Sequence, residues 1–349
     1  MIKKSKGNFF LGAEHTPKFE IREMEIPPLA PDQVLVRNYS CGICGTDVHI
    51  YHGGKGASPV NPPVVLGHEF SGVVEAVGQA VTTLKAGDHV TVDPNIYCQK
   101  CRPCRMGRKQ NCEHLFAIGV NTNGGFAQYA VCPETQCLRV DDRVDFDEAA
   151  MAEPLACAIH GMDKANIRYG QSVLVIGGGT IGLLMVQLAR LAGASCIMLS
   201  EPIAMRRKIG LEVGADAAID PLHEDIVERI REITGQDGAD VVIECVGKVG
   251  AVEQALHAAG PCGTVLLFSV PETGTAASLS LNDVFDKELT VMGSRINPDT
   301  HQRAVNLLNG GRLQIKKLIT HTYDMAHLED AIHMQMSSDS IKVVVHPQA

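Results

Sequence analysis

The feature that most constrains the fold is a regular alternation that begins near residue 170. Short β-favouring runs alternate there with helical segments of about ten to fifteen residues, which is typical of a parallel, doubly wound sheet. Helices are predicted at 180–193, 202–213, 223–234 and 249–259. The predicted strands are SVLVI (172–176), SCIML (195–199), AAID (217–220), DVVIEC (240–245), TVLLF (264–268) and LTVMG (289–293). Six strands is the number in a complete dinucleotide-binding sheet.

The first of these strands runs into VIGGGTIG, where Gly177, Gly179 and Gly182 form G-x-G-x-x-G. The motif follows a predicted strand and opens a predicted helix, which is the context it requires. Its glycines allow a tight turn, a close backbone approach to a pyrophosphate, and close packing of helix against strand. The N–H groups of the first helical turn, at Thr180 and Ile181, are then expected to face the phosphates. The alternative is a glycine-rich turn without a ligand.

Glu201 ends the second predicted strand, nineteen residues after Gly182. A carboxylate at this place accepts hydrogen bonds from the ribose hydroxyls and repels a 2′-phosphate, so we predict NAD rather than NADP. Arg206 and Arg207 weaken this preference, because both lie near enough in sequence to contact a phosphate.

The first 150 residues have a different pattern, which predicts a β-barrel or sandwich with long loops. Its strands are QVLVRN (33–38), SGVVEAV (71–77), DHVTV (88–92) and FAQYAV (126–131). A helix is predicted at 147–162, with Asp147 as its N-cap and a kink at Pro154. Helices at 299–309 and 324–336 and a strand at 341–345 make a tail too short for a domain, so we expect it to pack onto the first one. The predicted domains are therefore 1–153 with 296–349, and 154–295.

Charge and hydropathy exclude several classes of protein. The formal net charge of −9 argues against general affinity for nucleic acid or an anionic membrane. The N-terminus lacks the apolar segment of a secretory signal. The most apolar stretch, 172–193, carries Gln187, Arg190 and three consecutive glycines, which makes it a poor membrane span. We expect a soluble cytoplasmic protein whose cysteines are reduced.

Four cysteines lie close together in YCQKCRPCRMGRKQNC: Cys98, Cys101, Cys104 and Cys112. In a reducing compartment such a cluster indicates a metal rather than disulfides. An iron–sulfur run would have a last gap of three and then proline, whereas here the gap is seven and Glu113 follows. Four thiolates fill a tetrahedral Zn²⁺ and leave no open position, so we predict a structural zinc.

A zinc ribbon that binds nucleic acid is the alternative from another class of protein. Arg102, Arg105, Arg108 and Lys109 are interleaved with the cysteines, as such a module requires. The acidic overall charge and the lack of an aromatic stacking platform beside the basic run oppose it.

Two other segments, CGICGTDVHIYHGG (41–54) and PPVVLGHEFSG (62–72), hold a set of reactive side chains. If the chain is helical from Thr46 onward, Thr46 and His49 share one helix face. Any one of these residues alone is more simply explained as part of the core, but the set is harder to explain in that way. Its members are Cys44, Thr46, Asp47, His49, His68 and Glu69.

The chain combines these two segments with the four-cysteine run, AEPLACAIH and VIGGGTIG, and their order and spacing are those of one enzyme family. Over essentially its whole length the chain resembles the zinc-dependent medium-chain alcohol and polyol dehydrogenases. The resemblance implies an α/β protein with a GroES-like β-rich catalytic domain, completed by the C-terminal tail, and a Rossmann domain. It also implies NAD, one catalytic and one structural zinc ion, and a homo-oligomer, either a dimer or a tetramer.

The resemblance assigns roles to individual residues. It implies that Cys44, His68 and Glu153 ligate the catalytic metal, and that Glu69 ligates it or stands just behind it. Cys157 rivals Glu153, since the corresponding ligand in other alcohol dehydrogenases is cysteine; glutamate points to the sorbitol-type branch. Asp47 matches the carboxylate that orients His68, and Thr46 and His49 match a proton relay. Zinc is the predicted metal, although this ligand set tolerates Mn²⁺ or Co²⁺ better than two thiolates and a histidine do.

The implied reaction is hydride transfer between NAD and a secondary alcohol, a polyol or polyol phosphate that becomes a ketose. Further cofactor contacts are expected from Val246, Phe268 and Ser269, and substrate contacts from Tyr51, Phe116 and Arg295. A surface ion pair explains Arg295 equally well. L-Threonine 3-dehydrogenase, 2,3-butanediol dehydrogenase and an inactive relative that only binds cofactor are the alternatives.

Overall fold

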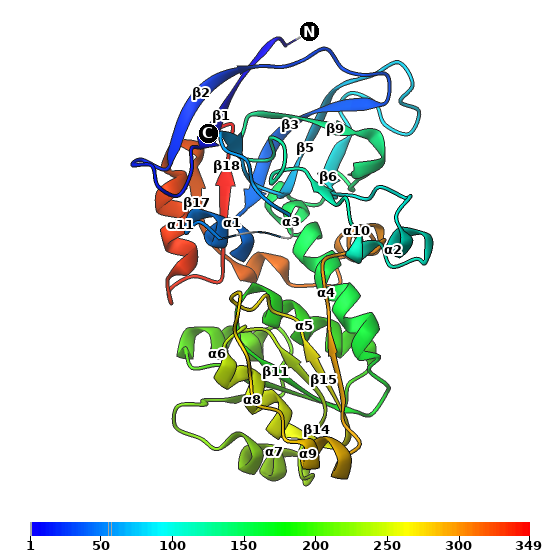
Figure 1. Ribbon diagram of the computed structural model, residues 1–349, viewed down its shortest axis with the longest axis vertical. Coiled ribbons are helices and arrows are strands. Elements are labelled where there is room, and N and C mark those ends of the chain that lie inside the picture. The colour runs from blue at the N-terminus through cyan, green and yellow to red at the C-terminus, as the bar shows by residue number, and fades with distance from the viewer. Residues whose placement is uncertain (1, 55, 57) are drawn as a thin grey trace. The chain divides into compact units, whose positions relative to one another are not determined.

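The computed structural model describes residues 2–54, 56 and 58–349. The chain forms two compact units, one that runs to Ala156 and resumes at Asn297–Ala349, and one made of Cys157–Ile296. Figure 1 shows the elements of both units. Within the described part of the chain, every helix is too short or too polar to cross a membrane.

The second unit is built on a six-stranded sheet in which every neighbouring pair is parallel. Its strand order is β13-β12-β11-β14-β15-β16, which confirms the doubly wound topology. The strands are β11 (Ser172–Ile176), β12 (Cys196–Ser200), β13 (Ala217–Ile219), β14 (Ala239–Glu244), β15 (Ala259–Leu267) and β16 (Thr290–Gly293). Only β15 begins much earlier than predicted, because Ala259 pairs with Ala239 across an irregularity in register.

Four predicted helices of this unit are present, and a fifth, α9, was not predicted. They are α5 (Thr180–Ala192), α6 (Ala204–Glu212), α7 (Ile226–Thr234), α8 (Val249–Ala258) and α9 (Leu281–Asp286). α7 begins later than predicted because the Asp225 carboxylate accepts hydrogen bonds from two N–H groups of its first turn. α5 and α7 end at Gly193 and Gly235, whose φ angles are +91° and +73°. Glycine adopts this left-handed conformation without the strain a side chain would cause.

The first unit has a seven-stranded sheet in the order β10-β6-β5-β3-β18-β17, with β9 also paired to β3. Its strands are β3 (Gln33–Gly42), β5 (Glu69–Val77), β6 (His89–Val92), β9 (Tyr129–Pro133), β10 (Cys137–Arg139), β17 (Ile319–Asp324) and β18 (Lys342–His346). β18 pairs antiparallel with β3 (Figure 1). The C-terminal tail therefore completes the sheet of the N-terminal segment, as predicted.

Shorter elements surround this sheet, and none of the strands among them was predicted; β10 and β17 of the sheet itself were not predicted either. The other strands are β1 (Lys4–Phe10), β2 (Phe19–Glu25), β4 (Val64–Val65), β7 (Asn95–Ile96) and β8 (Phe116–Ala117). The helices are α1 (Gly45–Tyr51), α2 (Arg102–Arg105), α3 (Phe146–Ala150), α10 (His301–Asn309) and α11 (Leu328–Met336). Helix α4 (Ala152–Ala165) begins in this unit and belongs to the second unit from Cys157 onward. An apolar core that includes Phe70, Phe126 and Leu66 lies beneath the sheet, and all three side chains are fully buried.

The prediction of one helix at 147–162 was wrong. The structure has two helices there, α3 and α4, separated at Met151. Asp145 rather than Asp147 caps α3, because its carboxylate accepts a hydrogen bond from the Asp147 N–H. Pro154 lies in the first turn of α4, where its missing N–H removes no helical hydrogen bond. The break therefore comes before the proline.

Candidate metal centre and cofactor loop

The four-cysteine run forms a compact lobe of the first unit around α2. The Sγ atoms of Cys98, Cys101, Cys104 and Cys112 all lie within 4.8 Å of one another. Two Sγ–Sγ distances, Cys98–Cys104 and Cys101–Cys112, are 4.0 Å each. A tetrahedral site with Zn–S bonds of about 2.3 Å separates its sulfurs by about 3.8 Å. The arrangement therefore fits a zinc ion with no position left for a substrate.

Backbone N–H groups in this lobe donate hydrogen bonds to two of the cysteine sulfurs, which stabilises the thiolate form. The Cys98 Sγ accepts hydrogen bonds from the N–H groups of Lys100 at 3.5 Å and Cys101 at 3.4 Å. The Cys112 Sγ accepts from Cys98 and His114, both at 3.4 Å. The bonds from Lys100 and Cys101 lower the pKa of the Cys98 thiol to about 6. The fold thus favours the metal-binding thiolate at Cys98, whereas burial, with hydrogen bonds to the Cys101 and Cys112 sulfurs, raises the pKa of the Cys104 thiol to about 12.

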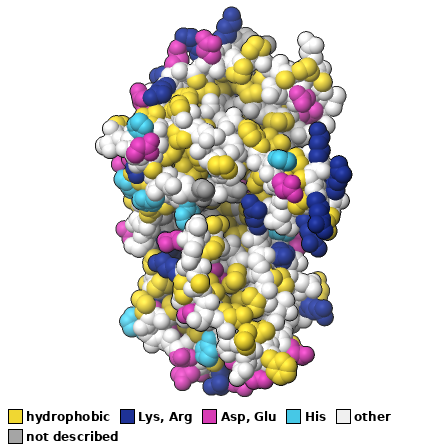
Figure 2. All heavy atoms as spheres, viewed as in Figure 1, with side chains coloured by type: hydrophobic (Ala, Val, Ile, Leu, Met, Phe, Trp, Pro, Cys, Tyr) yellow, Lys and Arg dark blue, Asp and Glu magenta, His cyan; other side chains and the backbone are white. Residues whose placement is uncertain are grey.

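Exposed cations surround the lobe: Lys100, Arg102, Arg105 and Arg108. Figure 2 shows Lys and Arg side chains gathered on the flank where Figure 1 places α2. Lys109 instead pairs with Asp299 at 2.8 Å. Four thiolates around a divalent ion carry a net negative charge, and these cations offset it. That role accounts for the basic residues without a nucleic-acid ligand.

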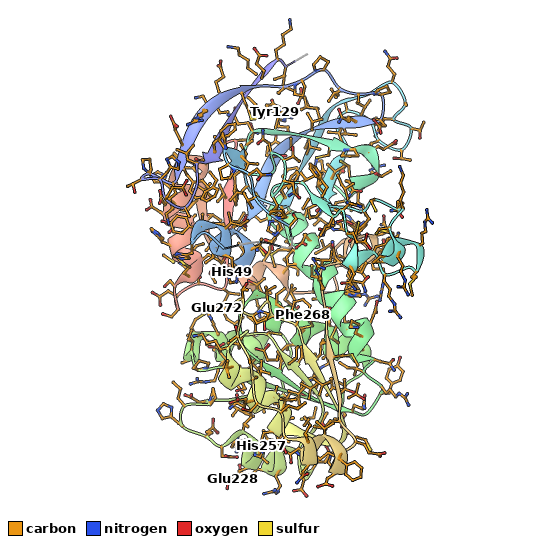
Figure 3. The ribbon with its side chains drawn as sticks, viewed as in Figure 1. His49, Tyr129, Glu228, His257, Phe268 and Glu272 are labelled. Carbon is orange, nitrogen blue, oxygen red and sulfur yellow. The ribbon has the colours of Figure 1, made fainter. Side chains whose placement is uncertain are left out.

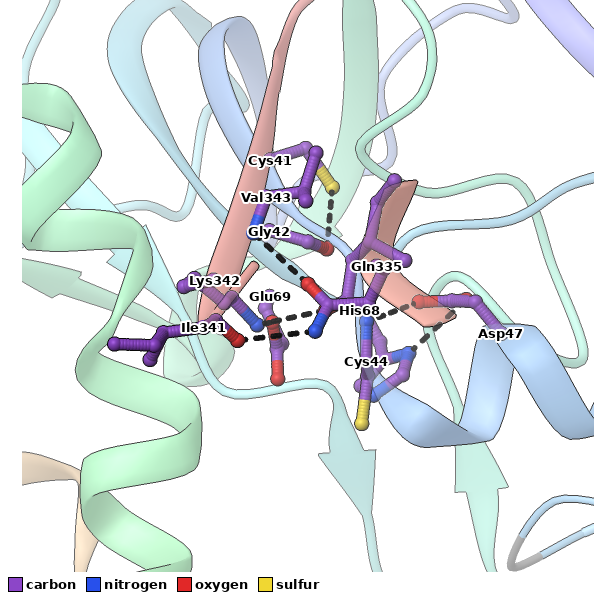
Figure 4. Close-up of polar contacts among 11 residues, drawn as sticks. Cys41, Gly42, Cys44, Asp47, His68, Glu69, Gln335, Ile341, Lys342 and Val343 are labelled. Carbon is purple, nitrogen blue, oxygen red and sulfur yellow. Dashed lines mark hydrogen bonds and ion pairs between the residues drawn. The ribbon is translucent and has the colours of Figure 1, made fainter. Parts of the chain in front are cut away.

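A second group of possible metal ligands forms at the N-terminus of α1. The ligand atoms of Cys44, His68 and Glu69 lie within 4.8 Å of one another (Figure 4). Cys44 precedes the first residue of α1. Glu69 begins β5, and the register of β5 against β3 places it opposite Gly42. Sheet pairing thus brings together residues that are more than twenty positions apart.

Asp47 supports this group with both of its carboxylate oxygens. Its Oδ2 accepts a hydrogen bond from the Cys44 N–H at 2.9 Å and so closes the first turn of α1. Its Oδ1 lies 3.7 Å from the Nδ1 of His68, and both atoms are buried without a hydrogen bond in the described structure. A shift of about half an ångström would join them by a hydrogen bond. Such a bond orients a histidine ligand and leaves its other nitrogen for a metal.

Lys342, which the sequence reasoning missed, lies against the same group. It begins β18, is 2% exposed, and forms a buried ion pair with Glu69. Its Nζ also donates to the Ile43 carbonyl at 2.9 Å. A Cβ at Gly42 would lie 2.5 Å from Glu69 Oε2 and 2.6 Å from Lys342 Cε, so a side chain at this position would displace the ends of both paired groups. A lysine inside the apolar run IKVVV was the signal that could have revealed it.

Burial and charge act in opposite directions on this group. Burial, with the Glu69 charge, raises the pKa of the Cys44 thiol. Burial by itself lowers the pKa of His68, but Asp47 and Cys44 outweigh it and the net shift is upward. The same competition, with Glu69 as the opposing charge, raises the pKa of Lys342. A buried site in which anions outnumber permanent cations suits a divalent cation, and a thiol with an imidazole and a carboxylate suits zinc.

The structure does not bring every predicted residue to this group. Glu153 is buried in the first turn of α4 but is outside the set of mutually close ligand atoms. Thr46 and His49, the latter labelled in Figure 3, are both partly buried on α1. Cys157 belongs to the second unit.

The three predicted substrate contacts lie in different settings. The Tyr51 hydroxyl donates to Glu329 at 2.8 Å and contacts His333 Nε2 at 2.9 Å, and burial with the Glu329 bond raises its pKa to about 12. Tyr51 therefore ties α1 to α11. Phe116 is 44% exposed on β8. Arg295 is exposed at the end of the second unit.

The second unit carries the glycine loop. β11 ends at Ile176, Gly177 has a φ of +99°, and α5 begins at Thr180 after Gly179. A Cβ at Gly182 would lie 1.7 Å from the Gly177 carbonyl oxygen, so any side chain there would force the loop away from α5. The first turn of a thirteen-residue helix follows directly. This is the arrangement that binds a pyrophosphate.

Glu201 lies beside this loop, directly after β12. Its carboxylate is buried and accepts hydrogen bonds from the N–H groups of Gly178 at 2.6 Å and Ile203 at 2.8 Å. Arg207 donates to the Glu201 and Pro202 carbonyls, at 2.8 Å each. Its guanidinium also pairs with Asp220 at 3.0 Å. Arg207 is therefore engaged by the protein itself.

The remaining predicted cofactor residues follow β14 and β15. Val246 is 41% exposed, and a Cβ at Gly177 would lie 2.7 Å from its Cγ2, so it packs on the glycine loop. Phe268, labelled in Figure 3, directly follows β15, and Ser269 comes next. Both Val246 and Ser269 bond to the Glu244 carboxylate, a buried group that the sequence reasoning did not single out.

Comparisons with known proteins agree with these features. Residues 30–142 match the alcohol dehydrogenase GroES-like domain, and residues 180–310 match the zinc-binding dehydrogenase family. An L-threonine 3-dehydrogenase of Caldanaerobacter subterraneus subsp. tengcongensis is 35% identical over 95% of this chain and 96% of its own. A sorbitol dehydrogenase of Halalkalibacterium halodurans is 37% identical over 95% and 96%. The crystal structure of a zinc-binding dehydrogenase from Sinorhizobium meliloti 1021 bound to NADP is 40% identical, covers 99% of this chain and 100% of that one, and superposes with a TM-score of 0.93.

Proposed function

The chain belongs to the zinc-dependent medium-chain alcohol and polyol dehydrogenases, and from this we propose that it oxidises a secondary alcohol of a polyol or polyol phosphate to the ketose. The hydride goes to NAD, and the reverse reaction reduces the ketose. The convergence of Cys44, His68 and Glu69 on one buried point carries this proposal.

A bound zinc ion at that point supplies a Lewis acid that lowers the pKa of the substrate hydroxyl. The chain's own residues perform the rest. Cys44 and His68 would hold the ion, Asp47, 3.7 Å from the His68 ring, would orient that ring, and Lys342 fixes the Glu69 carboxylate. Glu153 is the proposed third protein ligand. Thr46 and His49, one helical turn apart on α1, carry the hydroxyl proton toward solvent.

The substrate class rests on the ligand set and on relatives. A glutamate, Glu153, stands where other alcohol dehydrogenases have a second thiolate, and a named sorbitol dehydrogenase is among the relatives. L-Threonine is the second candidate, because several relatives at similar identity are named L-threonine 3-dehydrogenase. Threonine carries a carboxylate and an ammonium group that an unphosphorylated polyol lacks, so the two substrates require different pockets.

A substrate screen tests this proposal directly. Purified protein is assayed with sorbitol, xylitol, arabitol, their phosphates, L-threonine and 2,3-butanediol, and reduced nicotinamide is followed by absorbance. Turnover of a polyol or polyol phosphate with a kcat/KM well above that of threonine is the expected result. Turnover of threonine or butanediol alone would refute the substrate class but not the reaction type.

We propose NAD as the preferred cofactor. The Glu201 carboxylate stands beside the glycine loop, and Arg207 is already engaged by Asp220 and two carbonyls. The test compares kcat/KM for NAD and NADP in the parent and in Glu201→Ala. A parent preference for NAD that falls by at least about tenfold in the variant is expected, about 1.4 kcal/mol of discrimination. A parent that prefers NADP would contradict the proposal.

We also propose a homo-oligomer that works in the cytoplasm. β16 is an edge strand of its sheet, and an edge strand with unpaired backbone groups favours pairing with another chain. Leu281 and Phe285 of the neighbouring α9 are 78% and 82% exposed. All twelve cysteines are free thiols, as in a reducing compartment. Light scattering of the parent and of Phe285→Glu tests the assembly, and a monomeric parent would contradict it.

A further inference from the structure

Glu244 occupies a special place in the second unit. It is the last residue of β14 and pairs with Ile176, the last residue of β11. From β11 the chain continues to β12 and β13 on one side, whereas from β14 it continues to β15 and β16 on the other. The strand order therefore reverses between β11 and β14. In sheets of this kind the ligand binds at that reversal, beyond the carboxyl ends of the strands.

The Glu244 carboxylate is buried, 1% exposed, and holds two loops together. Its Oε1 accepts hydrogen bonds from the N–H groups of Val246 at 2.6 Å and Gly247 at 2.7 Å, in the loop after β14. Its Oε2 accepts a short hydrogen bond from the Ser269 hydroxyl, in the loop after β15. All three donors are neutral. Hydrogen bonds offset the cost of burying a carboxylate, so the Glu244 side chain and the two loops hold each other in place.

The two loops also touch each other and the glycine loop. Val246 packs over Gly177, where a Cβ would lie 2.7 Å from its side chain. Gly247 has a φ of +79°, and a Cβ there would lie 3.3 Å from the Ser269 Cβ. The conformation of the surface after β14 and β15 thus depends on the three bonds to Glu244.

Glu201 provides the corresponding support on the other side of the reversal. It follows β12 and bonds the N–H of Gly178 in the glycine loop. A dinucleotide lies across such a crevice, with one mononucleotide half on each side and the acidic residue after the second strand on the adenosine ribose. The loops held by Glu244 therefore lie on the side of the nicotinamide half.

We propose that Glu244 is a positioning residue for the nicotinamide half of the cofactor. It holds the loops after β14 and β15 in the conformation that receives this half and leaves the adenosine half to the glycine loop and Glu201. This inference rests on the proposed function in that it assumes a nicotinamide dinucleotide as ligand. It predicts that loss of Glu244 weakens NADH and spares ADP, which lacks the nicotinamide half.

Isothermal titration calorimetry of NADH and of ADP tests this in the full chain. We expect Glu244→Ala to raise the Kd of NADH at least about tenfold, equivalent to about 1.4 kcal/mol, and that of ADP by less than about twofold. Glu244→Gln keeps an oxygen for the two N–H groups and offers an amide to the Ser269 hydroxyl, so it should stay within about threefold of the parent for both ligands. Glu232→Ala, which removes an exposed carboxylate of α7, is the matched control and should change neither.

The outcomes separate the two proposals. A parent that binds neither NADH nor ADP overturns the proposed function and this inference with it. A parent that binds both, with a Glu244→Ala variant that weakens both equally or neither, overturns this inference alone. If Glu244→Ala does not fold, Glu244→Asp keeps the carboxylate but withdraws it by one methylene from its three donors, and it should still weaken NADH more than ADP. An unchanged ratio of the two Kd values in that variant would equally overturn the positioning role.

Discussion

The buried ion pair between Lys342 and Glu69 allows a quantitative prediction. The change is Lys342→Met, which keeps most of the length of the side chain and removes its charge. Glu69, 1% exposed, then loses its cationic partner, and the Ile43 carbonyl loses its donor. Removal of one partner from a buried pair costs about 3–5 kcal/mol, because an uncompensated charge stays buried.

This cost translates into a large change in melting temperature. A domain of about 150–250 residues loses about 2–4 °C for each kcal/mol, so we expect the Tm of the first unit to fall by about 6–20 °C. Differential scanning calorimetry of the zinc-loaded protein measures the change. Lys4→Met is the matched control: the Lys4–Glu23 pair is about 60% exposed on both sides, and such a pair contributes at most about 1 kcal/mol.

A second variant distinguishes the ion pair from simple packing. Glu69→Gln combined with Lys342→Met removes both charges, so it should unfold closer to the parent than Lys342→Met does. A Lys342→Met protein that melts within about 2 °C of the parent would refute the reasoning, since that is less than 1 kcal/mol. Equal losses in the single and double variants would show that packing rather than charge accounts for the loss of stability.

Three further predictions concern other parts of the chain. Gly182→Ala places a Cβ 1.7 Å from the Gly177 carbonyl oxygen and should weaken NADH binding at least about tenfold by calorimetry. Cys104→Ser should lower the zinc content by about one ion per chain and reduce the Tm, with activity retained below the unfolding temperature. Asp147 raises the pKa of His346, so this pair stabilises the fold below the unfolded-state pKa of about 6.5 and the gain is lost as pH rises through the folded-state pKa. His346→Gln should therefore flatten the pH dependence of Tm on the alkaline side of about pH 6.5.

Each of these predictions can be contradicted by a specific result. Unchanged NADH affinity in Gly182→Ala would show that the glycine loop does not approach the pyrophosphate. Immediate loss of activity in Cys104→Ser with an intact fold would show that the four-cysteine lobe is the catalytic site. An identical profile of Tm against pH in His346→Gln would show that the His346–Asp147 pair is too well solvated to affect stability.

Local sequence patterns were sufficient for the strands and four helices of the second unit, but not for α9. The central strands β11, β12 and β14 are largely buried on both faces, so each appears as a mainly apolar run, and the helices between the strands carry their own 3.6-residue periodicity. The position of Glu201 after β12 and of the three glycines after β11 followed from the same patterns. The four-cysteine lobe was also readable, because all its ligands come from fifteen consecutive residues, 98–112.

Tertiary contacts decided the features that sequence spacing does not contain. β2 has exposed polar residues at most of its positions, so its sequence lacks the apolar alternation that would predict a strand. Its place in the fold is set by pairing with β1, which puts Phe19 opposite Phe10. Asp145 rather than Asp147 caps α3 because the side chain of Asp147 is drawn to Ser40 and His346, residues far away in the chain.

The same division applies to the candidate catalytic site. The resemblance of the sequence to an enzyme family singled out Cys44, His68 and Glu69, and the sequence predicted that the C-terminal tail packs onto the first domain. Only the tertiary structure placed Lys342 beside Glu69, 273 positions away. The physical reason is that a charge is tolerated in a buried strand only where a specific partner lies across the sheet, and the partner is chosen by strand order and register rather than by local sequence.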